Sequence, residues 1–198
     1  SNFATLLMDS CINMASVSGK SAGGLVGNMV DNFVISNSAN LGTITGMGEG
    51  AAGLINSASL NYTGTITNSY NSGTVTSTNT SAGLVGSASV TSLTISNSYN
   101  TGDVEGSGTA GGLVGAGETS LSLFQNYNTG KVRTTGYSGV AGGLVGKTTK
   151  PAVIANNYNL GEVSAHTGFG RAGGIDGLVA TSGSDMTVLL NNYSMGTI

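Results

Sequence analysis

The sequence predicts an all-β protein, a right-handed parallel β-helix (β-solenoid) of about six to seven coils with roughly 30 residues in each coil. Three observations lead to this fold class. The composition opposes helices, two short motifs recur along most of the chain, and equivalent apolar residues recur at the same place in every copy. We expect residues 1–198 to form a single solenoid domain that is a fragment of a longer chain.

The composition favours strands around a buried core. The chain has 34 Gly, and its many Ser, Thr and Asn residues compete with a helix for backbone hydrogen bonds. Disorder is also disfavoured, because 38% of the residues are hydrophobic and the net charge is only −3. Val, Ile, Thr and Tyr are frequent, and these residues prefer strands.

Two motifs alternate along the chain and define the repeat. The first reads AGGLVG at 22–27, and related copies begin at Ala52, Ala82, Ala110 and Ala141. The second resembles ISNSYNTGDV, and its copies begin at Ile35, Ile66, Ile95, Leu123, Ile154 and Leu189, with a weaker copy at Met8. The glycines of the second motif, Gly42, Gly73, Gly102, Gly130, Gly161 and Gly196, follow one another at steps of 31, 29, 28, 31 and 35 residues. Each repeat is therefore long enough for one coil of two or three short strands.

Stacked coils place equivalent residues above one another at the strand spacing of about 4.8 Å, so columns of the repeat become ladders. Three columns are apolar and would fill the interior. They are Met8, Ile35, Ile66, Ile95, Leu123, Ile154 and Leu189; Leu25, Leu54, Leu84, Leu113 and Leu144; and Val17, Ile44, Val75, Val104, Val132, Val163 and Ile198. In the sixth copy, AGGIDGLV, either Ile175 or Leu178 fits the second column, and the spacing to the next motif favours Leu178. This choice puts the extra residues of that copy into a loop between Val163 and Gly177.

The polar columns predict hydrogen-bonded corners. Two amide columns are expected to bridge from coil to coil: Asn37, Asn68, Asn97, Gln125, Asn156 and Asn191, and then Asn40, Asn71, Asn100, Asn128 and Asn159. The glycine after each corner is expected to have φ above zero. A tyrosine column, Tyr70, Tyr99, Tyr127, Tyr158 and Tyr193, has two interpretations, ring packing between coils, which we favour, or stacking on sugars.

The sequence contains few of the residues and motifs that catalytic sites use. The chain has one His and one Cys, so no intrachain disulfide can form, and no zinc, nucleophile-elbow, phosphate-loop or calcium-repeat motif is present. The closest approach to a polysaccharide-acting site is a charged group, Asp103, Glu105, Lys131, Arg133 and Glu162, whose opposite charges would alternate between neighbouring coils. We interpret it as cross-strand ion pairing. We therefore expect no enzyme, cofactor or metal site, and a polysaccharide-acting β-helix enzyme stays a remote alternative.

Charge and hydropathy argue against nucleic-acid binding and against a membrane-spanning segment. Six Lys and Arg against nine acids do not supply the basic stripe that nucleic-acid binding needs. No apolar run approaches the ~20 residues that span a bilayer.

Two lengthened loops in neighbouring coils are the best candidate for partner recognition. One runs from Val132 to Ala141 and carries Tyr137. The next runs from Val163 to Gly177 and carries the candidate residues His166, Phe169 and Arg171, together with Asp176. Binding residues concentrate on loops that a rigid scaffold holds, and aromatic rings beside Arg make good contact anchors. The alternative interpretation is a pair of ordinary solvated bulges.

The GGLVG core followed by NSYNxGxV resembles the GLUG repeat, from which Cys11, Ala15, Ala39 and Asn56 depart at consensus positions. The resemblance covers nearly the whole chain and implies the non-catalytic repeat region of a large bacterial surface protein, either adhesin-like or part of an IgA-specific metallopeptidase. It implies an extracellular, cell-surface or secreted location and flanking repeats or domains in the parent protein. Two functions follow as hypotheses: an adhesin-like segment that contacts host protein or glycan through its loops, or a structural spacer that presents another module.

Overall fold

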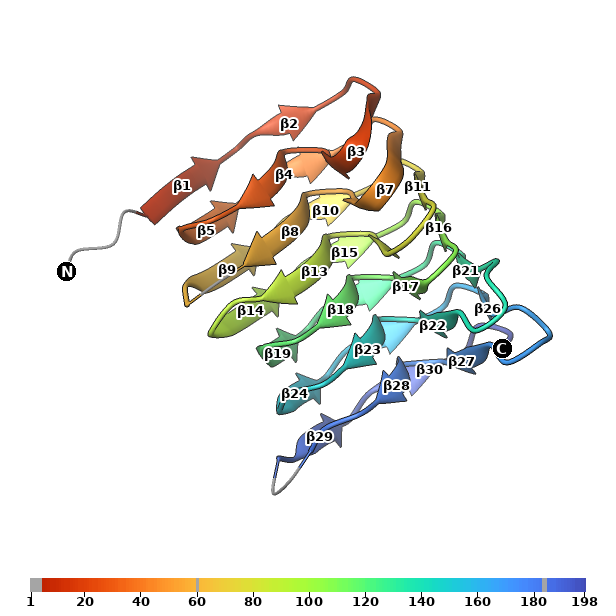
Figure 1. Cartoon of the computed structure of the whole chain (residues 1–198). Coiled ribbons are helices and arrows are strands. Elements are labelled where there is room, and N and C mark those ends of the chain that lie inside the picture. Colours follow the sequence, from red (N-terminus) through yellow and green to blue (C-terminus); the bar gives the residue numbers. More distant parts are fainter. Residues whose placement is uncertain (1–4, 60, 183–184) are drawn as a thin grey trace.

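The structure, a computed structural model, describes residues 5–59, 61–182 and 185–198, and its chain winds into a parallel β-solenoid of about six turns with ~30 residues per turn (Figure 1). Within these residues every strand pairs in parallel with its equivalents in the neighbouring coils, and the strands form four sheets. The predicted fold class is confirmed.

Sheets A and B each have seven strands. Sheet A contains β1 (Thr5–Asp9), β5 (Asn32–Ser36), β9 (Thr63–Thr67), β14 (Ser92–Ser96), β19 (Ser120–Phe124), β24 (Ala152–Ala155) and β29 (Thr187–Leu190). Sheet B contains β2 (Ile12–Asn13), β6 (Ala39–Asn40), β10 (Tyr70–Asn71), β15 (Tyr99–Asn100), β20 (Tyr127–Asn128), β25 (Tyr158–Asn159) and β30 (Tyr193–Ser194).

Sheets C and D complete each coil. Sheet C begins with the long strands β3 (Val17–Gly23) and β7 (Ile44–Ala52), and each later coil replaces them with two short strands. The first of each pair is β11 (Val75–Ser77), β16 (Val104–Gly106), β21 (Val132–Thr134) or β26 (Val163–Ser164), and the second is β12 (Ser81–Ala82), β17 (Thr109–Gly111), β22 (Val140–Gly142) or β27 (Arg171–Gly173). Sheet D contains β4 (Val26–Met29), β8 (Ile55–Ser59), β13 (Val85–Ser89), β18 (Val114–Gly117), β23 (Val145–Thr148) and β28 (Asp176–Val179).

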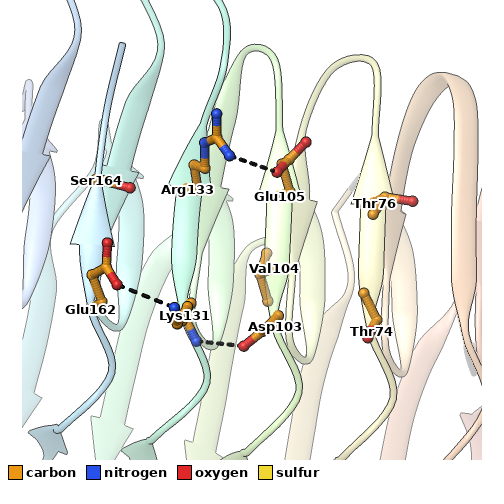
Figure 2. Close-up of a pocket in the computed structure, with 9 residues that line it drawn as sticks. All are labelled: Thr74, Thr76, Asp103, Val104, Glu105, Lys131, Arg133, Glu162 and Ser164. Carbon is orange, nitrogen blue, oxygen red and sulfur yellow. Dashed lines mark hydrogen bonds and ion pairs between the residues drawn. The ribbon is translucent and has the colours of Figure 1, made fainter. Parts of the chain in front are cut away.

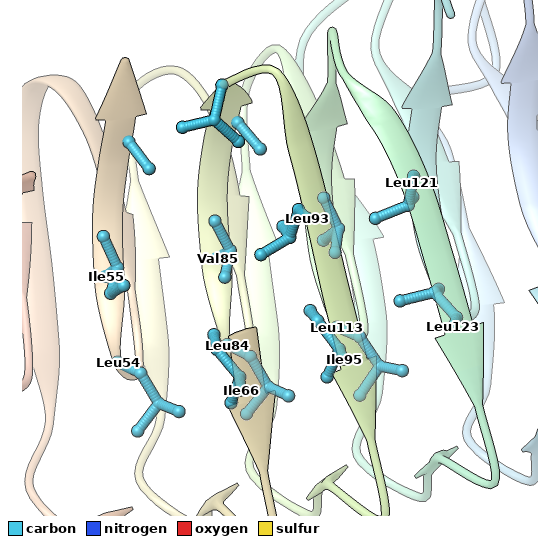
Figure 3. Close-up of a cluster of buried hydrophobic side chains, with 14 of the residues drawn as sticks. Leu54, Ile55, Ile66, Leu84, Val85, Leu93, Ile95, Leu113, Leu121 and Leu123 are labelled. Atoms are coloured by element: carbon cyan, nitrogen blue, oxygen red, sulfur yellow. The ribbon is translucent and has the colours of Figure 1, made fainter. Parts of the chain in front are cut away.

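The three predicted apolar columns form the core except at the last coil, where Leu189 and Ile198 are 48% and 67% exposed because no further described coil covers them. Ile66, Ile95 and Leu123 are register partners in sheet A and are fully buried (Figure 3). Leu84 lies opposite them at the start of sheet D, where its N–H donates to the Leu113 carbonyl 3.0 Å away. The valine column lines a second cluster inside sheet C. Burying one such side chain contributes about 1.5–3 kcal/mol, so the repetition itself supplies the stability.

The residue predicted for the core position of the sixth copy is wrong. The Leu144 N–H donates to the Ile175 carbonyl, and Lys147 is the register partner of Leu178, so Ile175 and not Leu178 continues the leucine column. The cause is the glycine pair before it: a Cβ on Gly143 would lie 2.1 Å from the Gly174 carbonyl oxygen, so these backbones fix the register. The expectation that this choice lengthens the loop between Val163 and Gly177 further is wrong as well. That loop is as long as the one after Val132, and the extra residues of this copy lie after β28, in a segment that includes the undescribed residues 183–184.

The second amide column makes the predicted ladder. The Asn71 Nδ2 donates to the Asn100 Oδ1 at 2.7 Å and also to the Gly73 carbonyl at 2.8 Å. The same two bonds recur at Asn40, Asn100 and Asn128. These amides are fully buried, so each bond satisfies groups that water does not reach.

The first amide column does not form the predicted ladder, and the glycine of the same corner does not have the predicted backbone conformation. Asn37, Asn68, Asn97, Gln125, Asn156 and Asn191 are exposed, and no amide-to-amide bond joins them in the described chain. They have φ between 49° and 58°, the left-handed region that Asn tolerates well. The glycine of the corner is needed for close approach instead, because a Cβ on Gly73 would lie 1.9 Å from the Gly42 carbonyl oxygen. The expectation of positive φ at that glycine is wrong.

A further ladder was not predicted. From Ser38 to Asn157, the residue after each left-handed position is buried, and its side chain accepts the backbone N–H of its equivalent in the preceding coil. The Ser69 N–H donates to the Ser98 Oγ at 3.1 Å, and the Ser98 N–H donates to the Asn126 Oδ1 at 2.9 Å. The column has Ser in the earlier coils and Asn from Asn126 onward, because either side chain can supply the acceptor.

Candidate functional site

The two predicted recognition loops come together at one corner of the solenoid. The first loop leaves the end of β21 and the second leaves the end of β26, in neighbouring coils (Figure 1). The Tyr137 ring centroid lies 5.3 Å from that of Phe169, edge to face at 84°, and 5.8 Å from that of His166. Tyr137 is 62% exposed and Phe169 is 67% exposed, so the cluster of these three rings, called the aromatic cluster below, faces solvent.

Backbone hydrogen bonds hold the aromatic cluster in place. The Phe169 N–H donates to the Tyr137 carbonyl at 2.9 Å, which continues the coil-to-coil pairing through the loops. The Gly168 N–H donates to the His166 Nδ1 at 3.0 Å, which fixes the imidazole against the backbone of its own loop. A Cβ on Gly168 would lie 2.5 Å from the Tyr137 ring, so only glycine allows the ring to lie across the second loop.

Arg171, the fourth predicted residue, does not join the cluster. It opens β27, is exposed, and its backbone N–H donates to the Gly139 carbonyl at 2.9 Å. Its side chain makes no ion pair within the described residues. The structure therefore brings three of the four predicted residues into contact and places the fourth on the adjoining strand.

A hollow on the outer face of sheet C is the second element of the site. It has a volume of about 360 Å³ and runs across β11, β16, β21 and β26 (Figure 2). We call it the sheet C cleft, and it is lined by Thr74, Thr76, Asp103, Val104, Glu105, Lys131, Arg133, Glu162 and Ser164. The strands alternate inward and outward residues, so the buried valines hold the polar residues on either side of them outward.

The predicted alternation of charge is present in the cleft. The Lys131 ammonium lies 3.4 Å from a Glu162 carboxylate oxygen, and the Arg133 guanidinium lies 3.7 Å from one of Glu105. Asp103 accepts the backbone N–H of Lys131 at 2.9 Å, where the ammonium was the expected partner. All these side chains are about half exposed or more, so each pair contributes at most about 1 kcal/mol. Two cations and three anions leave the cleft with a net charge of −1.

The tyrosine column forms a continuous stack on sheet B. Neighbouring ring centroids, from Tyr70 to Tyr193, are 4.7–5.3 Å apart and the rings are within 9° of parallel. Desolvation raises the pKa of Tyr99 and of Tyr127. Because the rings cover one another's faces, the stack agrees with the favoured interpretation, packing between coils, and leaves few faces for a sugar.

The shifted pKa of Asp176 and the placement of possible metal ligands add no catalytic group or metal site to the cleft. Burial raises the pKa of Asp176 to about 6, but this carboxyl belongs to sheet D and bonds to Thr148. Among the described residues no three His, Cys, Asp or Glu side chains are grouped to hold a metal ion.

Thr76 and Ser164 line the hollow together with the charged residues, and this was not predicted from the repeat. A signal does exist in the repeat: the positions on either side of the valine column vary from Thr to Asp, Lys and Glu, while the column itself stays apolar. Side chains that vary within a uniform repeat are those free of the packing requirement.

Comparisons with protein-family models, curated proteins and solved structures find no match to this chain. No helix within the described residues could cross a membrane.

Proposed function

We propose that this chain is a non-catalytic recognition domain, adhesin-like and displayed at the surface of a bacterial cell or secreted, which contacts host protein or glycan through its loops. The observation that carries the proposal is the aromatic cluster. Phe169 and Tyr137 are each more than 60% exposed, although burial is the usual fate of such rings. Holding them in solvent on a rigid scaffold is the arrangement that binding surfaces use.

The resemblance to GLUG repeats supports the proposed location, and the uniform ladders support the alternative function, a structural spacer that presents another module. The two functions differ in what the loops do. A spacer needs the ladders only, whereas a recognition domain needs the aromatic cluster as well. The recognition function is preferred because nothing in the ladders requires exposed rings on the two loops.

The test is a binding screen of the purified chain against extracellular-matrix proteins and a glycan array. The test variant is Tyr137→Ala, Phe169→Ala and Arg171→Ala together. The control variant, Met47→Ala with Leu160→Ala, removes two exposed apolar side chains elsewhere, which are 64% and 44% exposed. Binding that the test variant loses and the control keeps supports the recognition function. A folded chain that binds nothing favours the spacer.

A further inference from the structure

We infer that the sheet C cleft and the aromatic cluster form one binding site, and that its ligand is an uncharged oligosaccharide. This inference rests on the proposed recognition function and names the ligand class for it.

Continuity of the chain joins the two parts of the site. Arg133 lies in the cleft on β21, four residues before Tyr137, and Ser164 lies in the cleft on β26, two residues before His166. Both loops leave their strands at the end where Arg133 and Ser164 lie (Figure 2). The loops that carry the aromatic cluster therefore begin beside the part of the cleft on β21 and β26, and a ligand in the cleft can extend along them toward the rings.

The side chains of the cleft suit hydroxyl groups. Glu105 and Glu162 supply acceptors, and Lys131 and Arg133 supply donors, in neighbouring coils. Adjacent strands are about 4.8 Å apart, so donors and acceptors recur at a spacing comparable to the length of one pyranose residue. A sugar hydroxyl both donates and accepts, so it can bond to either member of an ion pair without separating the pair. Aromatic rings at the end of such a row would pack on the apolar face of a sugar ring.

The charges of the sheet C cleft favour an uncharged ligand over an acidic one. The two cations of the cleft are already paired with carboxylates, and the cleft as a whole carries a net charge of −1. An acidic glycan in the cleft would meet three carboxylates, Asp103, Glu105 and Glu162, and no cation there that lacks a carboxylate partner. Arg171, which has no ion-pair partner among the described side chains, lies outside the cleft, on β27. The volume of about 360 Å³ is within the range of small-ligand sites, which begins near 300 Å³, and suits a few sugar rings.

The experiment uses an array of neutral and acidic oligosaccharides, followed by calorimetric titration of the strongest neutral binder. The cleft variant is Glu105→Gln with Arg133→Gln, which keeps both side chains polar, leaves the net charge of the cleft unchanged and removes the charge-assisted hydrogen bonds of this pair. Its control is Lys20→Gln with Glu49→Gln, which removes the exposed 2.8 Å ion pair on β3 and β7, outside the site. The cluster variant is Tyr137→Ala with Phe169→Ala. Thermal unfolding establishes that each variant is folded.

The inference predicts binding to neutral oligosaccharides, weakened about tenfold in the cleft variant and abolished in the cluster variant, with the control unchanged. Binding should change by no more than about twofold between low salt and about 0.5 M NaCl, because an uncharged ligand has no charge to screen. Preference for acidic glycans with strong salt dependence would overturn the ligand class.

Two further outcomes separate this inference from the proposed function. A protein partner that needs the aromatic cluster, or a glycan whose binding the cleft variant leaves intact, refutes the single glycan site and leaves the recognition function standing. No binding to any probe by the folded chain refutes both.

Discussion

Asp176 allows a sharp test of how the stack responds to pH. In the register of sheet D it takes the position that Val145 and Val114 hold in the two preceding coils, where both valines are fully buried. Its carboxylate accepts the Thr148 hydroxyl at 2.8 Å and the Leu178 N–H at 3.0 Å. Desolvation outweighs these bonds and raises the pKa of Asp176 from its ordinary 3.8 to about 6.

The direction and size of the effect follow from that pKa. A carboxyl with a higher pKa in the folded than in the unfolded state favours folding when protonated, so its stabilising contribution is complete below pH 3.8 and is lost as the pH rises through 6. The difference between 3.8 and about 6 corresponds to at most about 3 kcal/mol, of which about 1 kcal/mol is lost between pH 5 and pH 7.5. The loss should stay local, because each coil of a solenoid contacts only its neighbours.

Hydrogen exchange is the assay, read at the amides of β28 in the chain and in Asp176→Asn, which keeps an acceptor for Thr148 and cannot ionise. The strands packed against β28 carry two charged residues, Lys147 on β23 and Arg171 on β27. Both are present in the two proteins, so their effect on the pH dependence cancels when the proteins are compared. Relative to the variant, we expect the protection of β28 in the unchanged chain to fall about fivefold to tenfold between pH 5 and pH 7.5. Equal protection in the two proteins at both pH values would refute the reasoning.

Three further substitutions test the stacked columns, each by urea unfolding. Ile95→Asp should cost at least about 4 kcal/mol and unfold the central coils, because it buries an unpaired charge among fully buried apolar residues, and an unchanged midpoint would reject that core assignment. Asn100→Leu should cost about 3 kcal/mol, because it leaves the Asn128 Oδ1 and the Gly102 carbonyl without their donor; a loss below about 0.5 kcal/mol would show that the ladder is dispensable. Gly102→Ala should cost about 3 kcal/mol, because its Cβ would lie 2.1 Å from the Gly73 carbonyl oxygen, whereas Gly117→Ala, with its nearest contact at 3.4 Å, should be close to neutral; equal losses would contradict the close-approach argument.

Most of the fold could be predicted from the sequence because each structural requirement is repeated. A buried Ile every ~30 residues, such as Ile66 and Ile95, is weak evidence alone, but all the copies together fix both the coil length and the register. The same repetition identified the Asn71 ladder and the ion pair between Glu105 on β16 and Arg133 on β21. These features depend only on which residues are stacked, and stacking follows from the period.

The errors arose where local backbone geometry decides. Spacing favoured Leu178 for the core, but the close approach of Gly143 and Gly174 fixes the register and places Ile175 there. Likewise, an Asn–Gly corner could place its positive φ at either residue. The structure places it at Asn68, five residues before Gly73, because Ser69 must then turn inward to accept a backbone N–H from Ser38. Neither distinction is present in residue type or period.

The site was only partly predictable for a related reason. The sequence shows that the loops of Tyr137 and Phe169 are longer than their equivalents in earlier coils, but contact between the rings depends on Phe169 donating its N–H across the coils to Tyr137. A hollow is less predictable still, because it depends on the relative heights of side chains such as Thr76 and Arg133 on different strands.

The division between inside and outside limits where a partner can be recognised. Inward positions of each coil are committed to apolar columns or to the Asn100 and Ser98 ladders, and a change there costs stability. Outward positions carry no such requirement, so Thr74, Asp103 and Lys131 can differ although their coils are otherwise alike. A partner that reads this surface meets residues about 30 apart in sequence as direct neighbours. Its contacts must therefore run along the solenoid axis, which is why an extended, repeating ligand suits the sheet C cleft better than a compact one.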